Sequence, residues 1–344
     1  MGGISDKNPF KPRVIVKDTF YETIDSIKKS NIKLPPFSES GDIEIDFDSL
    51  SCKIDQMESD LIHTLNIKSG MEFSKTDITI AAYDESIQRY SALEGKGVFT
   101  AHAVVIPRDN DYAAISYLTA YFYTKSDEIG KIPGITVVKD PQREMTRDKM
   151  DDEIYILKEV PENSILFIDG PLIAGDAFPK MIQQQSYFVE NNIIPVFFVK
   201  NSNSNMIVNY TDLTENKYNS DMHWASSILK EGQRTSFFKY VDSFNENNTK
   251  IFCYLKFFKY SSPVRVEFFI KTFEKYRGLI NQIMDLILYL LICQGNPKNA
   301  QLRPIAVAEM YAREIIKMVD VKEIMRKSGV TSTMNEDRDF KLGD

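Results

Sequence analysis

The feature that most constrains the fold is a series of apolar, β-branched segments that begins at residue 77. Three of these segments follow one another directly and are predicted to be strands. Predicted helices then alternate with two further apolar segments. In chain order, the strands are expected at 77–86, 97–107 and 112–124, followed by a helix at 143–160, a strand at 164–170, a helix at 180–192 and a strand at 193–200. This order indicates an α/β domain.

The order of these elements matches the RNase H-like arrangement, in which a three-stranded meander precedes alternating helices and strands. We therefore expect an α/β fold with an RNase H-like mixed-sheet core and flanking helices. The predicted regions are a mostly helical N-terminal region (1–75), the core (76–200), an insertion (201–262), C-terminal helices that complete the domain (263–330) and a flexible tail (331–344). Within them we expect helices at 60–67, at 266–292 and, as the last helix, at 306–319, with a strand at 250–258.

Composition narrows the class of protein. No apolar run reaches the length of a membrane span, and the closest, at 279–293, contains Asn281 and Asp285. The three cysteines are widely separated, and the N-terminus lacks a signal peptide, so we expect a cytoplasmic protein without a membrane partner. The net charge of −7 counts against a broad DNA-binding surface, but it leaves room for a narrow basic channel.

Two predicted strands end in a carboxylate, Asp84 in AAYDES and Asp169 in LFIDGPL. Functional side chains of open α/β sheets gather at such strand ends. Two neighbouring carboxylates repel each other, and Mg²⁺ or Mn²⁺ relieves that repulsion with oxygen ligands. Phosphodiester cleavage uses this arrangement. The alternative is that both are turn residues, since Asp-Gly is a common turn signal.

A third acidic ligand is expected from the helix at 143–160. Glu153 is the first choice because it lies beside the apolar stripe, and Asp152 is the second. Lys200 ends the last predicted strand, where it would either neutralise a scissile phosphate or extend to solvent. The histidines form no metal-binding pair, and no phosphate-binding glycine loop occurs.

Taken together, these motifs resemble the NurA nuclease family. In AAYDES, Asp84 and Ser86 match the family's first strand motif, while Glu85 replaces a glycine. In LFIDGPL, Asp169, Gly170 and Leu172 match the second motif, while Pro171 replaces a serine. FFVKNSNS resembles the family's strand that ends in Lys before a Ser-rich turn, which is the position of Lys200.

The resemblance continues to about residue 318. Asp221, Gly232 and Arg234 match a segment with an Asp before a helix and a Gly-x-Arg turn, and a strand pair closing on Arg-x-Glu follows. The C-terminal motif departs most, because Arg303 and Tyr311 stand where the family has Tyr and His. Arg303 would still contact a phosphate, and Glu309 or Tyr311 would line the site.

The resemblance implies a metal-dependent homodimer with a central channel that degrades DNA 5′-to-3′, or also cuts single strands internally. It implies Mn²⁺ or Mg²⁺ as cofactor and docking on a hexameric HerA-type ATPase, in DNA end resection or in defence against phage. The expected DNA contacts are Lys200, Arg234, Arg303 and Tyr311. Two alternatives remain: an inactive adaptor subunit of such an ATPase, and an RNase H-like enzyme acting on RNA or hybrids.

Overall fold

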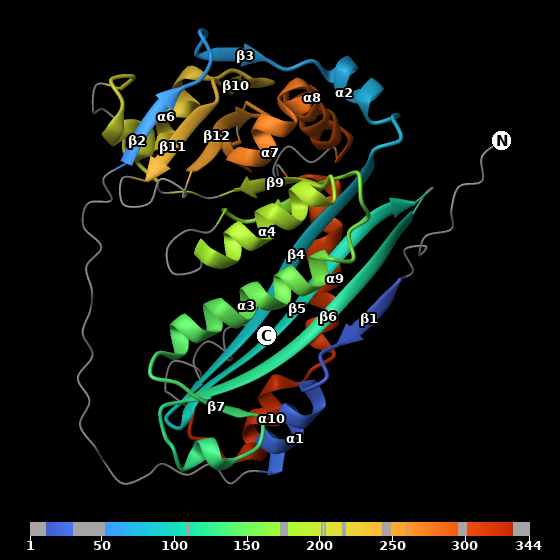
Figure 1. Cartoon of the computed structure of the whole chain (residues 1–344), viewed down its shortest axis with the longest axis vertical. Helices are drawn as coiled ribbons and strands as arrows, with labels where there is room; N and C mark the ends of the chain where they lie inside the picture. The colour runs from blue at the N-terminus through green and yellow to red at the C-terminus, as the bar shows by residue number, and fades with distance from the viewer. Residues whose placement is uncertain are drawn as a thin grey trace, which may run out of the picture. The chain divides into compact units, whose positions relative to one another are not determined.

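The computed structural model describes residues 12–29, 52–108, 111–172, 178–200, 202, 204–214, 218–242, 249–259, 261–294 and 301–332. The described residues form two compact units (Figure 1). The first unit takes its residues from Met1–Glu44, Asp84–Glu159 and Ala308–Asp344, and the second from Ile45–Tyr83 and Val160–Val307. Strand β4 and helix α9 contribute residues to both units.

The sheet of the first unit is an antiparallel meander of long strands. β5 and β6 pair without interruption from Lys96↔Tyr123 to Arg108↔Asp111, and the strand order is β1-β6-β5-β4. The short strands β1 and β7 both run parallel to β6. The strands are β1 (Arg13–Val16), β4 (Thr79–Ala92), β5 (Gly95–Arg108), β6 (Asp111–Thr124) and β7 (Ile135–Val137).

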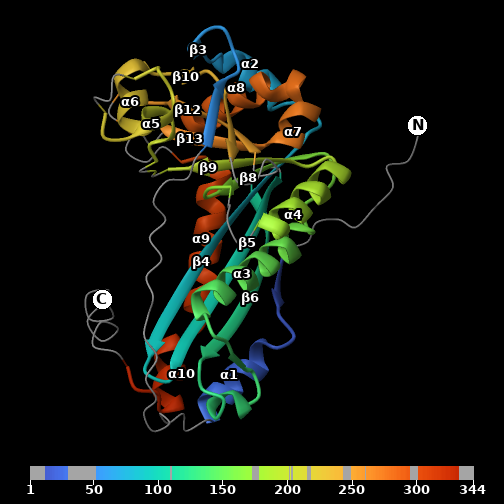
Figure 2. The same ribbon diagram turned by 60° about the vertical axis from the view of Figure 1, so that its left-hand side comes forward.

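Alternation of side chains along β6 separates the two faces of this sheet. Leu118, Ala120 and Phe122 pack in one core with α1 and α10, whereas Tyr121 and Tyr123 hydrogen-bond to carboxylates of α3. Figures 1 and 2 show α3 and α9 on opposite sides of these strands. The helices of this unit are α1 (Phe20–Lys29), η1 (Ile129–Lys131), α3 (Pro141–Leu157), α9 (Arg303–Lys317) and α10 (Val321–Ser328).

Helix α3 begins at a strong N-terminal signal. The side chain of Asp140 accepts hydrogen bonds from the backbone N–H groups of Gln142 and Arg143, and Pro141 occupies the first turn. The helix expected from the spacing at 143–160 is confirmed.

The sheet of the second unit includes the first residues of β4. Thr79–Tyr83 pair in parallel with Ser164–Ile168 of β8, and β8 pairs in parallel with β9. From β9 onward the strands are antiparallel, in the order β9-β13-β12-β10-β3, while β11 pairs with β12 and β2. The strands are β2 (Cys52–Gln56), β3 (Ile62–Thr64), β8 (Ser164–Asp169), β9 (Ile194–Val199), β10 (Gln233–Thr235), β11 (Phe238–Asp242), β12 (Thr249–Lys256) and β13 (Val264–Phe269). The helices are α2 (Ile67–Phe73), α4 (Phe178–Glu190), α5 (Met206–Tyr210), α6 (Asp221–Ile228), α7 (Ile270–Lys275) and α8 (Arg277–Gln294).

The strand order confirms the expected fold class, a mixed α/β protein with a large mixed sheet and flanking helices. The path β6-β5-β4-β8-β9 joins a three-stranded meander to two parallel strands, and α3 connects the meander to β8. This is the arrangement that the order of predicted elements indicated.

Three expectations about individual elements were wrong, one of them only in part. The segment 60–67 is not a helix, because Ile62–Thr64 pair with β10 as strand β3. The helical region expected at 266–292 is confirmed from Ile270 onward as α7 and α8, but its first residues belong to strand β13, whose aromatic and β-branched residues through Phe269 are buried in the sheet. Helix α10, rather than the segment at 306–319, is the last described helix.

The N-terminal region contains strands as well as helices. Its described part includes the short strands β1, β2 and β3 beside the helices α1 and α2. Residues 1–11 and 30–51 of that region, and 333–344 of the expected flexible tail, lie outside the described residues. Among the described helices, none has the length and apolar character that a membrane crossing requires.

Candidate metal centre

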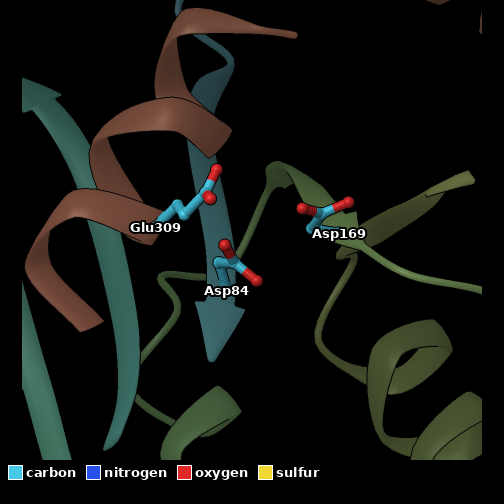
Figure 3. Close-up of side chains that lie close together, drawn as sticks. All are labelled: Asp84, Asp169 and Glu309. Atoms are coloured by element: carbon cyan, nitrogen blue, oxygen red, sulfur yellow. The ribbon is translucent and has the colours of Figure 1, made fainter. Parts of the chain in front are cut away.

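Three carboxylates converge in the structure: Asp84, Asp169 and Glu309 (Figure 3). Each offers an oxygen atom, and these atoms all lie within 4.8 Å of one another. They come from β4, the end of β8 and helix α9. We call these three residues the acid group.

The pairing of β4 with β8 explains why Asp84 and Asp169 meet. The parallel ladder ends at the pair Tyr83↔Ile168, and the two aspartates are the next residues of their strands. Asp84 is buried, and its Oδ1 accepts a hydrogen bond of 2.8 Å from the backbone N–H of Glu85. The two strand motifs therefore bring these carboxylates together, but only Asp169 ends its strand as expected, because β4 continues past Asp84 to Ala92.

The chain turns sharply after Asp169. Gly170 has a φ of 124°, a conformation that side chains with a Cβ rarely adopt, and its N–H donates to the carbonyl oxygen of Phe198. The glycine of LFIDGPL thus lets β8 end directly at the carboxylate.

The third member of the acid group is Glu309 of α9, whereas Glu153 and Asp152 of α3 were expected. Alternation along β4 places Asp84 and Glu85 on opposite faces, and Glu85 forms an ion pair with Lys149 of α3. Asp84 therefore points away from α3, and carboxylates on that helix lie on the other face of the sheet.

Asp152 has other partners on its own face. Its two oxygens accept hydrogen bonds of 2.9 and 2.7 Å from the Tyr121 hydroxyl, and Oδ1 accepts one of 3.0 Å from Lys17. Burial raises the pKa of Asp152, although Lys17 and Tyr121 oppose the rise. Glu153 is also buried on α3 and does not belong to the acid group.

Cations contact two members of the acid group. Lys200 follows β9, and its Nζ lies 2.5 Å from Oδ2 of Asp169. Arg313, one turn beyond Glu309 on α9, forms an ion pair with Glu309 through Nη2. The sequence indicated Lys200, but it gave no reason to single out Arg313.

Arg234 is not placed where it could bind DNA. Its side chain is 2% exposed, and its two terminal nitrogens donate to Glu58 at 2.7 and 2.8 Å and to Asn281 at 2.9 Å. The ring of Phe237 lies 4.2 Å from the guanidinium carbon. A phosphate has no access to a guanidinium enclosed in this way, so the expectation that Arg234 contacts DNA is wrong.

The other two expected contacts lie on α9. Arg303 is the first residue of the helix and is exposed, whereas Tyr311 is half-buried. Tyr311 follows Glu309 by two positions, and residues at that spacing do not share a helix face. Glu309 belongs to the acid group, and Tyr311 therefore lies on a different face of α9 from this carboxylate.

Glu267 is a buried residue that supports the turn after Asp169. Its Oε2 accepts a hydrogen bond of 2.8 Å from the backbone N–H of Leu172, and its Oε1 lies 2.7 Å from Lys250 and 2.9 Å from Nε of Arg265. Burial alone would raise the pKa of Glu267, but the two cations outweigh it and lower the pKa. The Arg-x-Glu pattern of β13 was the sequence signal for this arrangement.

Asp221, another residue of the matching motifs, has a structural role in the second unit. It is fully buried, and Oδ1 accepts hydrogen bonds from the N–H groups of Ile207 and Val208 while Oδ2 accepts one from the Tyr254 hydroxyl. These bonds join α5, α6 and β12.

The acid group has the chemistry of a divalent-cation site. Carboxylate oxygens are the ligands that Mg²⁺ and Mn²⁺ prefer, and opposite ligands of such an ion lie about 4.2 Å apart. The oxygens of Asp84, Asp169 and Glu309 lie within 4.8 Å of one another, so a small contraction would bring them onto one ion. No cysteine or histidine belongs to the group, which disfavours zinc.

Comparison with known proteins identifies the family. The family model of the NurA domain matches residues 108–314, more than half of the chain; this range includes Asp169 and Glu309 but not Asp84. No curated protein sequence matches the chain. The similarities to solved structures are weak, so membership of the family rests on the match to the NurA family model.

Three solved structures illustrate these similarities. The NurA nuclease from Sulfolobus solfataricus is 13% identical, with 72% of this chain and 84% of that chain covered and a TM-score of 0.45. A NurA structure with manganese is 8% identical, with coverage of 69% and 85% and a TM-score of 0.41. Endonuclease V from Bacillus subtilis is 10% identical, with coverage of 76% and 86% and a TM-score of 0.38. On the strength of the family match, the chain belongs to the NurA family.

Proposed function

We propose that this protein is a metal-dependent DNA nuclease whose metal ligands are Asp84, Asp169 and Glu309. The observation that carries the proposal is the convergence of three carboxylates, with oxygens within 4.8 Å of one another, in a chain of the NurA family. Other NurA structures contain manganese, and one contains dAMP together with manganese. We propose Mn²⁺ or Mg²⁺ for this chain on the basis of its oxygen ligands.

In this proposal, the residues of the chain hold the reacting groups in place. A bound divalent ion supplies activation of water and stabilises the charge on the leaving oxygen. Asp84 and Asp169 hold their positions because adjoining paired strands carry them, and Glu309 completes the ligand set from α9. Lys200 contacts Asp169 and in this proposal neutralises charge on the scissile phosphate.

The test compares DNA cleavage by variants of the three acid-group carboxylates with cleavage by a variant of another carboxylate on α9. Glu309→Gln should abolish DNA cleavage with Mn²⁺ because it removes a charged ligand, and Asp84→Asn and Asp169→Asn should do the same. Glu314→Gln is the matched control, because Glu314 is an exposed residue of α9 outside the acid group. EDTA should stop cleavage by the wild type, and Mn²⁺ or Mg²⁺ should restore it better than Zn²⁺.

Wild-type cleavage by folded Glu309→Gln would remove Glu309 from the ligand set. Activity in excess EDTA would refute the metal mechanism altogether. Parallel assays on DNA, RNA and DNA–RNA hybrids decide between a DNA nuclease and an enzyme that acts on RNA. Failure to cleave any of them would favour an inactive adaptor subunit.

The finer parts of the proposal concern polarity and partners. We propose a homodimer that degrades DNA 5′-to-3′, with single-strand endonuclease activity as a second activity, and that works with a HerA-type hexameric ATPase. A protein of net charge −7 attracts long duplexes poorly, and a ring that threads DNA to the site would remove this handicap. The biological setting would be end resection in repair or defence against phage DNA.

Sedimentation and stimulation assays test the partnership. The pure protein should sediment as a dimer, and the cognate ATPase should increase cleavage of long duplex DNA. A monomer at micromolar concentration, or equal rates with and without the ATPase, would contradict this part of the proposal without affecting the metal site.

A further inference from the structure

Among the residues that the structure describes, Lys200 and Arg313 are cations that contact the acid group, and of these two only Lys200 was expected. Lys200 contacts Asp169 at 2.5 Å, and Arg313 contacts Glu309 through Nη2. The side chain of Lys200 is 28% exposed, whereas that of Arg313 is 65% exposed. The guanidinium of Arg313 thus lies at a metal-ligating carboxylate and is open to solvent.

The geometry points to Arg313 as a phosphate-binding residue of the active site, which contacts the DNA phosphate held at the acid group. This inference rests on the proposed nuclease function and adds to it a residue that contacts the substrate. A guanidinium has five N–H donors in a planar fork that fits phosphate oxygens, and the contact with Glu309 engages Nη2.

The balance of charge within the site supports this role. Among the described residues, Lys200 and Arg313 contact the three carboxylates and offset part of their negative charge. Removing the positive charge of Arg313 would make the site less attractive to the negatively charged phosphodiester.

A neighbouring ion pair shows what an ordinary surface contact on this helix looks like. Lys317 pairs with Glu314 at 2.7 Å, and its side chain is 65% exposed, the same fraction as that of Arg313. Glu314 lies outside the acid group. Lys317 therefore matches Arg313 in helix, charge, pairing and exposure, but not in its proximity to the ligands.

The experiment compares Arg313→Ala, Arg313→Lys and Lys317→Ala in the full chain. With Mn²⁺ and a single-stranded oligodeoxynucleotide, Arg313→Ala should lower kcat/KM about 10- to 100-fold, the range for a lost charge-assisted contact. The slope of log(kcat/KM) against log salt should also become less steep by about 0.7, the value for one phosphate contact on a single strand. Arg313→Lys should lie between, because it keeps the charge without the fork. Lys317→Ala should behave as wild type.

Mn²⁺ affinity without DNA, measured by calorimetry, distinguishes phosphate binding from mere positioning of Glu309. Arg313→Ala should bind Mn²⁺ as tightly as wild type or more tightly, because a cation beside the ligand is removed. Weaker Mn²⁺ binding in Arg313→Ala would overturn the inference and leave Arg313 as a support for Glu309. A wild-type rate and salt slope in Arg313→Ala would also overturn it.

These outcomes differ from a failure of the proposed function. If the wild type cuts DNA and Arg313→Ala cuts equally well, only the role of Arg313 is refuted. If the wild type does not cut, the anisotropy of a labelled oligodeoxynucleotide in Ca²⁺ still tests phosphate binding. Equal affinities of wild type and Arg313→Ala in that assay would refute the inference as well.

Discussion

Replacing Glu267 by glutamine tests how a buried charge maintains the turn that carries Asp169. Glu267 is fully buried, and its partners Lys250 and Arg265 have side chains that are only 13% and 7% exposed. Gln retains an oxygen that accepts the hydrogen bond from Leu172, but it has no charge. The substitution therefore leaves two cations in a poorly solvated environment without their shared counter-ion.

The magnitude follows from that environment. Removing one partner of a buried ion pair costs about 3–5 kcal/mol, since the remaining charge is left uncompensated. We expect the lower end, about 3 kcal/mol, because both cations retain some exposure to water. A loss of that size is a large part of the roughly 5–15 kcal/mol that stabilises a typical domain.

Urea denaturation followed by tryptophan fluorescence measures the loss of unfolding free energy in the second unit, which contains Glu267. The chain contains one tryptophan, Trp224, which is buried in the same unit as Glu267. Glu274→Gln is the control, because Glu274 is an exposed residue of the neighbouring helix α7. Equal urea midpoints for wild type and Glu267→Gln at neutral pH would refute the electrostatic reasoning.

The pH dependence gives an independent check of the sign. The pKa of Glu267 is lowered from the ordinary value of 4.5, so its contribution to stability is present in full above that value. The contribution is lost as the pH falls below 4.5 and through the lowered pKa of the folded protein. The difference in stability between wild type and Glu267→Gln should therefore be constant from pH 8 to about pH 5 and shrink in more acidic solution. A difference that grows on acidification would contradict this assignment.

Three further changes address the site and its surroundings. Gly170→Ala should destabilise the protein by about 1–3 kcal/mol and reduce cleavage, because φ of 124° strains an alanine; an unchanged melting temperature would contradict this. Arg234→Ala should destabilise the second unit by about 3 kcal/mol and leave the salt dependence of DNA cleavage unchanged, since Arg234 is an internal partner of Glu58; a shallower salt slope would return it to the DNA-binding surface. Lys200→Ala should lower kcat, with a loss of about 2–4 kcal/mol of transition-state stabilisation, and should change DNA affinity little. A loss of DNA affinity alone would show that Lys200 does not act at the scissile phosphate.

The sequence by itself determined the order of the core elements and singled out the two aspartates, Asp84 and Asp169. Apolar alternation, β-branched residues and turn signals act over a few residues, so the strands β4, β5, β6 and β8 were visible in the local pattern. Asp84 and Asp169 were visible for the same reason, because each follows an apolar run, although β4 continues past Asp84 and only β8 ends at its aspartate.

Only the tertiary structure decided which other side chains join or leave this site. Glu309 reaches the acid group from a helix far along the chain, while Glu153 faces the opposite side of the sheet from Asp84. From the sequence, Arg234 was expected to contact DNA, but in the structure its guanidinium is bonded to Glu58 and Asn281. Local patterns show that a helix has a polar face, but which sheet face that helix covers depends on long-range packing. That packing is why a carboxylate of α9, rather than one of α3, lies beside the two aspartates.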